Sequence, residues 1–310
     1  MKSDFIWLDG ELVPYDQANM HVLSPTVHYG PGVFEGIRCY ETPRGTAVFR
    51  LHEHLKRFIN SIHILGFENT GYNPEDLHEA VHLTIRANGF RECYIRPFMY
   101  LEGPLGLNLD ASRPIIAIAT WEWGTYLGQD ALEKGVRAMV SSFTRLHPNI
   151  NMTKAKIGGQ YVNSMLAKTL AKRLGFDEAI MLDPEGYVAE CSGQNLFIVR
   201  DGVIMTTPRA SILEGITRDA VITLARDSGY EITEERFSRD QLYIADEVFV
   251  TGTATEVAAV REIDFRTIGV GRMGPVTREL QTAFFETVRG NGPRSEEWLD
   301  YVVPEIVTAE

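Results

Sequence analysis

The stretch Lys154-Ala155-Lys156-Ile157-Gly158-Gly159-Gln160-Tyr161 decides how the rest of this chain is interpreted. Two lysines precede a pair of glycines, and a helical pattern runs from there to about residue 174. Glycines let the backbone pass close to a bound group, and a desolvated lysine loses its proton readily and becomes a nucleophile towards carbonyls. The alternative is two solvated lysines before a helix, because most lysines lie in water.

The composition is that of a globular protein. Of the 310 residues, 44% are hydrophobic, which is enough for a large core in one large or two ordinary domains. The formal charge of −12 disfavours nucleic acid and anionic membranes as partners, but leaves room for a local anion site at a helix end. No signal peptide and no membrane-spanning apolar run is present, so we expect a cytoplasmic protein.

The cysteines and histidines predict neither a set of disulfides nor a metal site. Cys39, Cys93 and Cys191 are far apart and odd in number, which predicts no disulfide framework and favours a reducing compartment. Histidines 21 and 28, and the pair 52 and 54, lack a neighbouring carboxylate and histidine set that would complete a ligand group. We therefore predict no metal site.

The first half alternates strands and helices. A hairpin turns on Asp9-Gly10, and helices are expected over 51–65 and 74–87. A strand follows over 93–100, and the apolar run 114–119 predicts a strand buried on both faces. Period two places Tyr94 and Arg96 on one face, whereas helical period places Arg57 opposite the apolar stripe, at the surface.

An aromatic and glycine-rich segment around 121–128 is the expected domain boundary. Its aromatics either line a cleft or pack between domains. We predict a smaller N-terminal α/β domain over 1–122, an interdomain loop over 123–133 and a larger C-terminal domain over 134–310.

The second half repeats the alternation, with strands over 136–142 and 178–182 and a helix over 160–174. The apolar face of that helix is expected to contain Val162, Leu166 and Leu170, with Met165 beside it. A later helix runs to about Ser228 with Thr217 as its expected N-cap, so that the amides of 216–219 form an anion site. The small residues of 252–256 offer a second place where amides converge.

One glycine pattern is a misleading match. Gly269-Val270-Gly271-Arg272-Met273-Gly274 fits the dinucleotide pattern, but the preceding strand is too polar and the following segment does not continue a βαβ unit. We interpret it as a loop before a last helix over 276–288.

Together, an activated lysine, a helix end for a phosphate, Glu190 in a strand and several tyrosines fit a pyridoxal phosphate site. A carboxylate beside the ring nitrogen keeps that nitrogen protonated, so the ring can absorb carbanion charge. The chain resembles the branched-chain amino acid aminotransferases among the fold type IV pyridoxal phosphate enzymes. Seven motifs carry the resemblance in family order, around Val33-Phe34-Glu35-Gly36, Tyr94-Ile95-Arg96, Trp123-Gly124-Thr125-Tyr126, Lys156-Ile157-Gly158-Gly159, Glu190-Cys191-Ser192-Gly193, Gly215-Ile216-Thr217-Arg218 and Gly252-Thr253-Ala254.

The resemblance implies a two-domain α+β or α/β fold, a homodimer or larger homo-oligomer, and a role for individual residues. Lys156 resembles the Schiff-base lysine and proton shuttle, whereas Lys154 does not match. The cofactor would be held by Arg57, Tyr161, Glu190, Ile216, Thr217 and Thr253, in a C-terminal cofactor-binding domain with the site at the domain interface. The substrate would be bound by Tyr29, Phe34, Tyr94, Arg96, Trp123, Tyr126, Thr253 and Ala254.

The implied reaction moves the amine of L-Leu, L-Ile or L-Val to 2-oxoglutarate in a ping-pong cycle. Arg96, with Tyr29 and Tyr126, would receive the γ-carboxylate, and the loop 101–108 would enter the neighbouring subunit's site. The alternatives are D-amino acid or (R)-amine transamination, aminodeoxychorismate lysis, or a catalytically idle homologue. Gln194, Cys191 and Pro31-Gly32 depart from the family pattern and leave substrate breadth open.

Overall fold

The structure is a computed structural model that describes residues 3–124 and 129–303, in two compact units. The first unit contains residues 1–123, 155–159 and 287–310, and the second contains 124–154 and 160–286. This division differs from the expected domains in two segments, because the five residues around Lys156 and the C-terminal segment belong to the first unit. Within the described ranges, no helix has the length and apolar character that a bilayer crossing requires.

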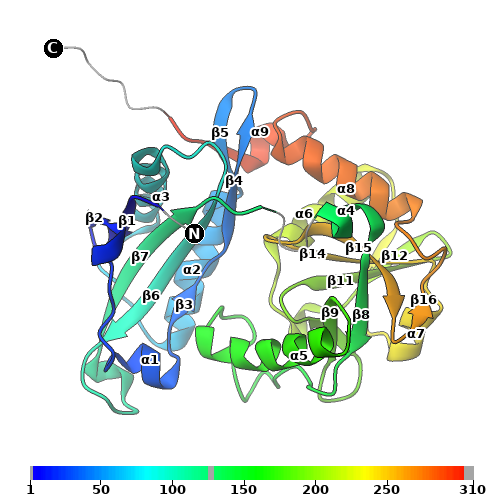
Figure 1. The fold of residues 1–310 in the computed structure, drawn as a ribbon, viewed down its shortest axis with the longest axis horizontal. Coiled ribbons are helices and arrows are strands. Elements are labelled where there is room, and N and C mark those ends of the chain that lie inside the picture. The colour runs from blue at the N-terminus through cyan, green and yellow to red at the C-terminus, as the bar shows by residue number, and fades with distance from the viewer. Residues whose placement is uncertain (1–2, 125–128, 304–310) are drawn as a thin grey trace. The chain divides into compact units, whose positions relative to one another are not determined.

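An eight-stranded antiparallel sheet forms the first unit, in the order β17-β5-β4-β6-β7-β1-β2, with β3 paired to β6 (Figure 1). Its longest pairing joins β6 and β7, whose residues 94–102 and 113–121 face each other along the full length. The strands are β1 (Phe5–Leu8), β2 (Glu11–Pro14), β3 (Val33–Phe34), β4 (Ile37–Thr42), β5 (Gly45–Phe49), β6 (Cys93–Glu102), β7 (Arg113–Trp121) and β17 (Leu299–Tyr301).

Local sequence signals account for the edges of these elements. The predicted hairpin is confirmed, since Asp9 and Gly10 both adopt positive φ between β1 and β2. Helix α2 (Leu51–Leu65) ends at a left-handed Gly66, as predicted. Helix α3 (Pro74–Asn88) begins at a capping box in which Asn73 and Asp76 each accept the other's backbone N–H.

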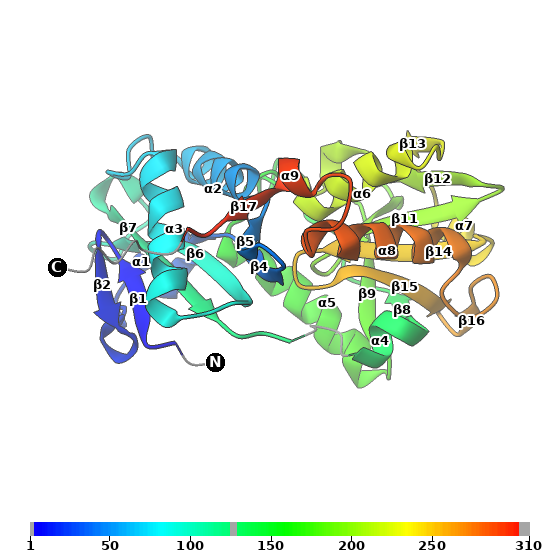
Figure 2. The same ribbon diagram turned by 90° about the horizontal axis from the view of Figure 1, so that it is seen from above.

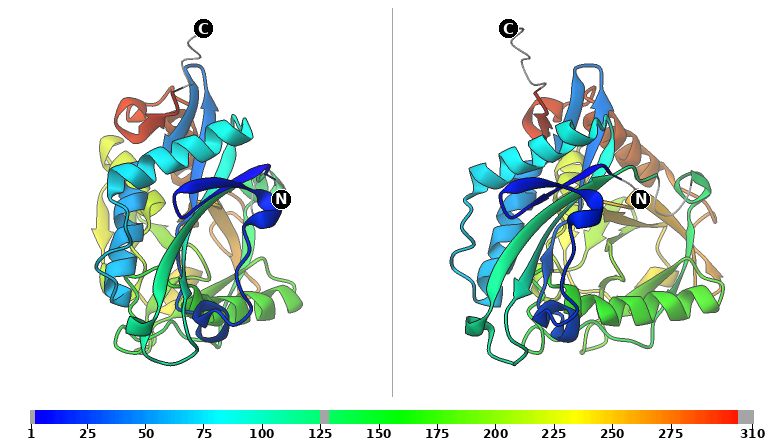
Figure 3. Two further views of the ribbon diagram at one scale, coloured as in Figure 1. Left: turned by 90° about the vertical axis from the view of Figure 1, so that its left-hand side faces the viewer. Right: turned by 60° about the vertical axis from the view of Figure 1, so that its left-hand side comes forward.

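The two faces of β6 have different environments. Ile95, Met99 and Leu101 pack under α2 and α3, which run in different directions over the same core (Figures 2 and 3). Arg96 and Phe98 lie on the opposite face, as period two requires, where they border a cavity of about 350 Å³. The expectation that 114–119 is buried on both faces is wrong, because Ala117 and Ala119 of β7 border this same cavity.

Two of the cysteines, although distant in sequence, meet in the sheet. Cys39 on β4 faces Cys93 on β6, and their Sγ atoms are 3.2 Å apart as free thiols. The Cys39 sulfur also accepts the Cys93 backbone N–H at 3.1 Å. Sequence distance therefore gave no indication of this contact.

A nine-stranded mixed sheet forms the second unit, in the order β10-β9-β8-β15-β14-β11-β12-β13, with β16 paired to β15. The pairs β8–β9, β8–β15 and β12–β13 are parallel. The strands are β8 (Val136–Val140), β9 (Glu178–Leu182), β10 (Val188–Cys191), β11 (Asn195–Arg200), β12 (Val203–Thr206), β13 (Ile232–Glu234), β14 (Glu247–Gly252), β15 (Glu256–Ile263) and β16 (Arg266–Thr267).

Helices of the second unit pack on this sheet: α4 on β15, α5 on β9 and α6 on β14. The glycine pattern of 269–274 is a loop between the short strand β16 and α8, as predicted. The helices along the chain are α1 (Pro25–Tyr29), α4 (Gln129–Lys134), α5 (Tyr161–Arg173), α6 (Ile216–Asp227), α7 (Arg239–Tyr243), α8 (Pro275–Val288) and α9 (Ser295–Trp298).

Helix α5 buries a different face from the one that the sequence predicts. Its buried residues are the small Ser164, Ala167 and Ala171, whereas the expected core residues Val162 and Met165 are 58% and 66% exposed. Small side chains let the helix backbone approach β9 closely, so close packing rather than the apolar stripe decides its orientation.

The segment 155–159 lies against β3 within the first unit. The Phe34 N–H donates to the Lys156 carbonyl at 3.1 Å, and the Gly158 N–H donates to the Gly32 carbonyl at 2.7 Å. The Gly159 N–H donates to the Gly30 carbonyl at 3.0 Å. A Cβ on Gly30 would lie 2.9 Å from the Gly159 Cα, so two glycines permit the contact.

Replacing Gly30 with alanine should therefore lower stability in two ways, through the left-handed backbone and through the close contact with Gly159. Gly30 and Gly71 have nearly equal positive φ, +80° and +85°, but a Cβ on Gly71 would meet no other atom within 4 Å. Gly71→Ala should lower the unfolding free energy by about 1 kcal/mol, the cost of a left-handed alanine. Gly30→Ala should lose roughly 1–3 kcal/mol more through overpacking. Urea unfolding of both variants measures the difference, and equal losses would contradict a tight backbone contact.

Candidate functional site

Lys156 is fixed by its backbone on both sides. Its N–H donates to the Ser61 hydroxyl of α2 at 3.0 Å, and its carbonyl accepts the Phe34 N–H. Its Nζ lies 4.8 Å from the centre of the Phe34 ring. Lys154 has a different environment in the second unit, where its Nζ pairs with the Glu214 carboxylate at 3.0 Å. Of the two lysines, Lys156 is the one that the first unit positions.

Several aromatic rings, among them Phe34, surround the Arg96 guanidinium in the first unit. The Arg96 guanidinium lies 4.7 Å from the Phe34 ring centre, and its Nη2 donates to the Tyr94 hydroxyl at 3.3 Å. Tyr94 in turn packs edge-on against Trp123, with ring centres 4.5 Å apart. The structure thus brings together four predicted substrate residues and Lys156. Such a site offers apolar surface beside a positive charge.

Two further residues shape this group. Arg38 is buried on β4, and its Nη2 donates to the Trp123 carbonyl at 2.8 Å. A Cβ at position 36 would lie 2.0 Å from the Tyr94 hydroxyl, so Gly36 leaves that hydroxyl its space. Both residues belong to the motif that follows Phe34, for which sequence reasoning gave no individual role.

Arg57 belongs to a buried cluster of charged side chains. Its Nε and Nη2 donate to the two oxygens of Glu35 at 2.6 and 2.9 Å, and His54 Nδ1 contacts the same carboxylate at 2.7 Å. Glu35 is fully buried, and only 14% of the Arg57 side chain is exposed. The surface position predicted from periodicity is therefore wrong, because a carboxylate from outside the helix reaches this face of α2.

The charges of this cluster follow from its burial and contacts. Burial raises the pKa of Glu35, but the charge of Arg57 and the hydrogen bonds from His54 and Arg57 outweigh burial and hold that pKa well below 4.5. Burial lowers the pKa of His54 below 6.5, and Glu35 offsets this effect only in part. At neutral pH the cluster therefore contains a carboxylate, a guanidinium and a neutral imidazole that donates from Nδ1.

In the second unit, Glu190 on β10 is a buried and well-held carboxylate. Arg145 Nε lies 2.6 Å from its Oε1, and Asn195 Nδ2 donates to its Oε2 at 3.1 Å. The Leu213 N–H approaches Oε1 at 3.3 Å. These three contacts fix the orientation of the Glu190 carboxylate. Sequence reasoning missed Arg145 because nothing in its surroundings signals the contact.

The first turn of α6 offers amide donors. Gly215, not Thr217, is the N-cap, so the predicted cap is wrong and Thr217 lies inside the first turn. Glycine has no side chain to bond these amides, and helix N-termini attract anions. The side chain of Asn195 explains why position 215 is a glycine, because a Cβ there would lie 2.0 Å from the Asn195 Oδ1. Asn195 therefore lies between Glu190 and this helix end.

The turn 252–255 connects β14 and β15, and it lies beside residues 193 and 194. Gln194 is buried, and its Nε2 donates to the Thr255 hydroxyl at 3.1 Å. A Cβ on Gly252 would lie 3.4 Å from the Gly193 carbonyl. This departure from the family pattern thus holds the turn that contains the predicted residues Thr253 and Ala254.

The remaining predicted residues are less defined. Tyr29 ends the short helix α1 and is 50% exposed. Tyr161 is the first residue of α5, and Ile216 is the first residue of α6. Tyr126 lies outside the described residues.

Comparisons with known proteins point in one direction. A family model described as amino-transferase class IV matches residues 32–263. The branched-chain-amino-acid aminotransferase of Pseudomonas aeruginosa is 50% identical over 299 residues, covering 96% of this chain and 97% of that protein. The protein of the same name from Escherichia coli (strain K12) is 45% identical over 304 residues, covering 97% and 98%.

A solved structure is equally similar over its whole length. The T.th. branched-chain amino acid aminotransferase with pyridoxamine 5'-phosphate has a TM-score of 0.94 and 51% identity, covering 98% of this chain and 100% of that chain. Structures of the same T.th. protein are complexed with N-(5'-phosphopyridoxyl)-L-glutamate and with 4-methylvaleric acid.

Glu35→Gln should show how much the buried cluster depends on charge. The variant removes the carboxylate that pairs with the largely buried Arg57, which should cost about 3–5 kcal/mol of unfolding free energy at pH 7. Because the native pKa of Glu35 lies below 4.5, its contribution is present above pH 4.5 and is lost as the pH falls further. The difference from the parent protein should therefore shrink in acid.

Glu53→Gln on the same helix is the matched control for this measurement. Glu53 pairs with Arg50 at 2.6 Å but is 38% exposed, so its loss should cost less than about 1 kcal/mol. Urea unfolding from pH 7 down to about pH 2 compares the variants. Equal losses in the two variants, or a difference that ignores pH, would show that Glu35 acts through packing alone.

Proposed function

The chain belongs to the class IV aminotransferases, and within them to the pyridoxal phosphate-dependent branched-chain amino acid aminotransferases of fold type IV; on this premise we propose its amine donors, acceptor and residue roles. The donors are L-leucine, L-isoleucine and L-valine, and the acceptor is 2-oxoglutarate. The products are the branched 2-oxo acids and L-glutamate, formed in a ping-pong cycle.

The side chains present fit the cofactor. The phosphate would take the uncapped amides of Ile216 and Thr217, the Arg57 guanidinium and Thr253, because a dianion needs several donors. Glu190 would face the ring nitrogen, and the buried Arg145 beside it holds its carboxylate in place. Tyr161 would donate to the ring's phenolic oxygen. When bound, pyridoxal phosphate supplies an electron sink for negative charge at the substrate α-carbon.

Lys156 would hold the cofactor's aldehyde carbon and carry the proton. Once the substrate amine has taken its place on that carbon, the freed Nζ of Lys156 would accept the proton from the substrate α-carbon and return it two atoms away, which completes a 1,3-shift. The backbone hydrogen bonds to Ser61 and Phe34 support this role, since they fix the base of a flexible side chain. A fixed base reduces the entropy lost in reaching the reactive geometry.

The observation that carries the substrate assignment is that two basic side chains contact the Phe34 ring. Arg96 and Lys156 both lie within 5 Å of its centre. An aliphatic side chain is bound by the ring and by Tyr94 and Trp123, whereas a γ-carboxylate is bound by Arg96. One pocket thereby serves both substrates. We assign the α-carboxylate to Tyr94 and to the amides of Thr253 and Ala254.

We propose a cytoplasmic homodimer, or a larger homo-oligomer, as the working assembly. The loop after β6 supports this, because Leu107 is 88% exposed and Leu105 is also exposed. Exposed leucines in a loop favour burial against another surface. We propose that the loop 101–108 enters the neighbouring subunit's site.

A visible spectrum of the purified protein tests cofactor, donor and acceptor together. The cofactor band at about 410 nm should bleach with L-leucine and return with 2-oxoglutarate. Lys156→Ala should abolish that cycle, and Lys154→Ala should retain it. A band that ignores L-leucine but responds to D-alanine or (R)-1-phenylethylamine would replace the substrate assignment and keep the cofactor. A band that responds to no amine would indicate an idle homologue.

Arg96→Leu should separate the two half-reactions. With the guanidinium removed, the γ-carboxylate of 2-oxoglutarate is buried unpaired, which should lower kcat/KM for that substrate by about 100-fold or more. The value for L-leucine should fall by less than about 10-fold, because its side chain contacts only apolar surface. Stopped-flow half-reactions measure both values. Arg91→Leu, on the exposed surface, is the control, and equal losses for the two substrates would exclude the assigned role.

A further inference from the structure

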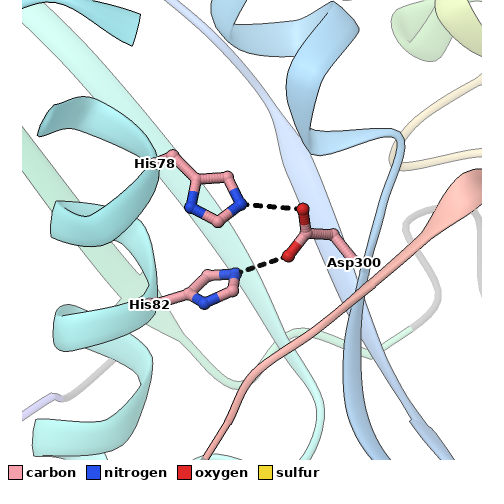
Figure 4. A group of neighbouring side chains, drawn as sticks. All are labelled: His78, His82 and Asp300. Atoms are coloured by element: carbon pink, nitrogen blue, oxygen red, sulfur yellow. Dashed lines mark hydrogen bonds and ion pairs between the residues drawn. The ribbon is translucent and has the colours of Figure 1, made fainter. Parts of the chain in front are cut away.

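Three side chains of the first unit converge in a place that the proposed reaction does not use. His78 and His82 lie one turn apart on α3, and Asp300 lies on β17 (Figure 4). His78 Nε2 is 2.7 Å from Oδ2 of Asp300, and His82 Nε2 is 2.8 Å from Oδ1. Both imidazoles turn the same nitrogen to one carboxylate, and the ring centres are 4.4 Å apart.

His82 is the unusual member of this group. Its side chain is only 6% exposed, and its Nε2 makes no aligned hydrogen bond despite the short distance to Asp300. Leaving a buried polar nitrogen without an aligned partner is unfavourable. The nitrogen therefore points from a buried position at the Asp300 carboxylate, its close partner in this group.

The spacing and chemistry of the three donors match a transition-metal site. Residues i and i+4 of a helix project from one face, and two imidazoles with one carboxylate are a frequent catalytic-type ligand set for Zn²⁺. The three donor atoms lie within 4.8 Å of one another. A tetrahedral zinc needs donors roughly 3.3 Å apart, which a small opening of the present group provides.

Side-chain exposure and the types of ligand atom indicate which metal ion the group would bind. His78 and Asp300 are 37% and 33% exposed, so water can reach the fourth position. Magnesium and calcium prefer all-oxygen ligand sets, whereas imidazole nitrogen favours zinc and its neighbours in the first transition row.

We propose that His78, His82 and Asp300 form a Zn²⁺-binding site, with water as the fourth ligand. The site joins α3 to the strand β17, which pairs with β5 at the edge of the sheet. Bound zinc thereby links β17 to α3. The two ligands His78 and Asp300 are 222 residues apart in the sequence. This proposal is independent of the aminotransferase reaction.

Zinc titration of the holoenzyme tests the site. The protein, free of any histidine tag, is treated with EDTA, dialysed and titrated with ZnCl₂ by isothermal calorimetry. We expect one zinc per chain with a Kd of about 10 μM or tighter, and a rise in Tm with zinc, since a ligand of the folded state stabilises it. Asp300→Asn and His78→Gln should each weaken binding by at least about 30-fold.

Two controls make the result decisive. His52→Gln removes an exposed histidine of α2 and should leave zinc binding unchanged. Asp300→Asn keeps the shape of the side chain, and unchanged Tm without zinc shows that the variant is folded. A Kd weaker than about 100 μM in the parent protein, or equal binding in Asp300→Asn and the parent, would overturn the proposal and leave a hydrogen-bonded group without metal.

Discussion

The position of Lys156 depends on a backbone contact between glycines. A Cβ on Gly30 would lie 2.9 Å from the Gly159 Cα, and a Cβ on Gly159 would lie 3.1 Å from the Gly30 carbonyl oxygen. The carbonyls of Gly30 and Gly32 accept the N–H groups of Gly159 and Gly158. These hydrogen bonds set the register that joins Lys156 to Phe34. Because Phe34 contacts both Lys156 and Arg96, one backbone register places the amine, the ring and the guanidinium together.

Buried carboxylates in both units have arginine partners. Glu35 is paired with Arg57, and Glu190 is paired with Arg145. Removing one partner of such a pair leaves a buried charge, which is more unfavourable than losing a surface pair. Each carboxylate also has a second polar contact, from His54 or Asn195, that restricts its rotation. Both carboxylates are therefore held in fixed orientations. Charges that are already in place can stabilise a transition state without having to reorient.

Sequence reasoning succeeded where the signals are local and failed where partners come from distant segments. The hairpin at Asp9-Gly10 and the helix 51–65 follow from turn residues and periodicity, and the structure confirms both. Arg57 was misplaced because its partner Glu35 lies 22 residues away, where helical period carries no information. The orientation of α5 was wrong because close packing of Ala167 and Ala171 outweighed a solvent-exposed apolar stripe. The order of the motifs, not any single spacing, identified the family.

The C-terminal segment has a consequence for how the chain is made. The first unit includes residues 287–303 of the described chain, and β17 pairs with β5 only after residues 299–301 exist. During synthesis from the N-terminus, the strand β5 therefore waits with an unpaired edge while the whole second unit is translated. Contacts of such long sequence separation also form slowly. An unpaired strand edge can pair with another chain, so the nascent chain is exposed to aggregation at β5 until residues 299–301 have been made.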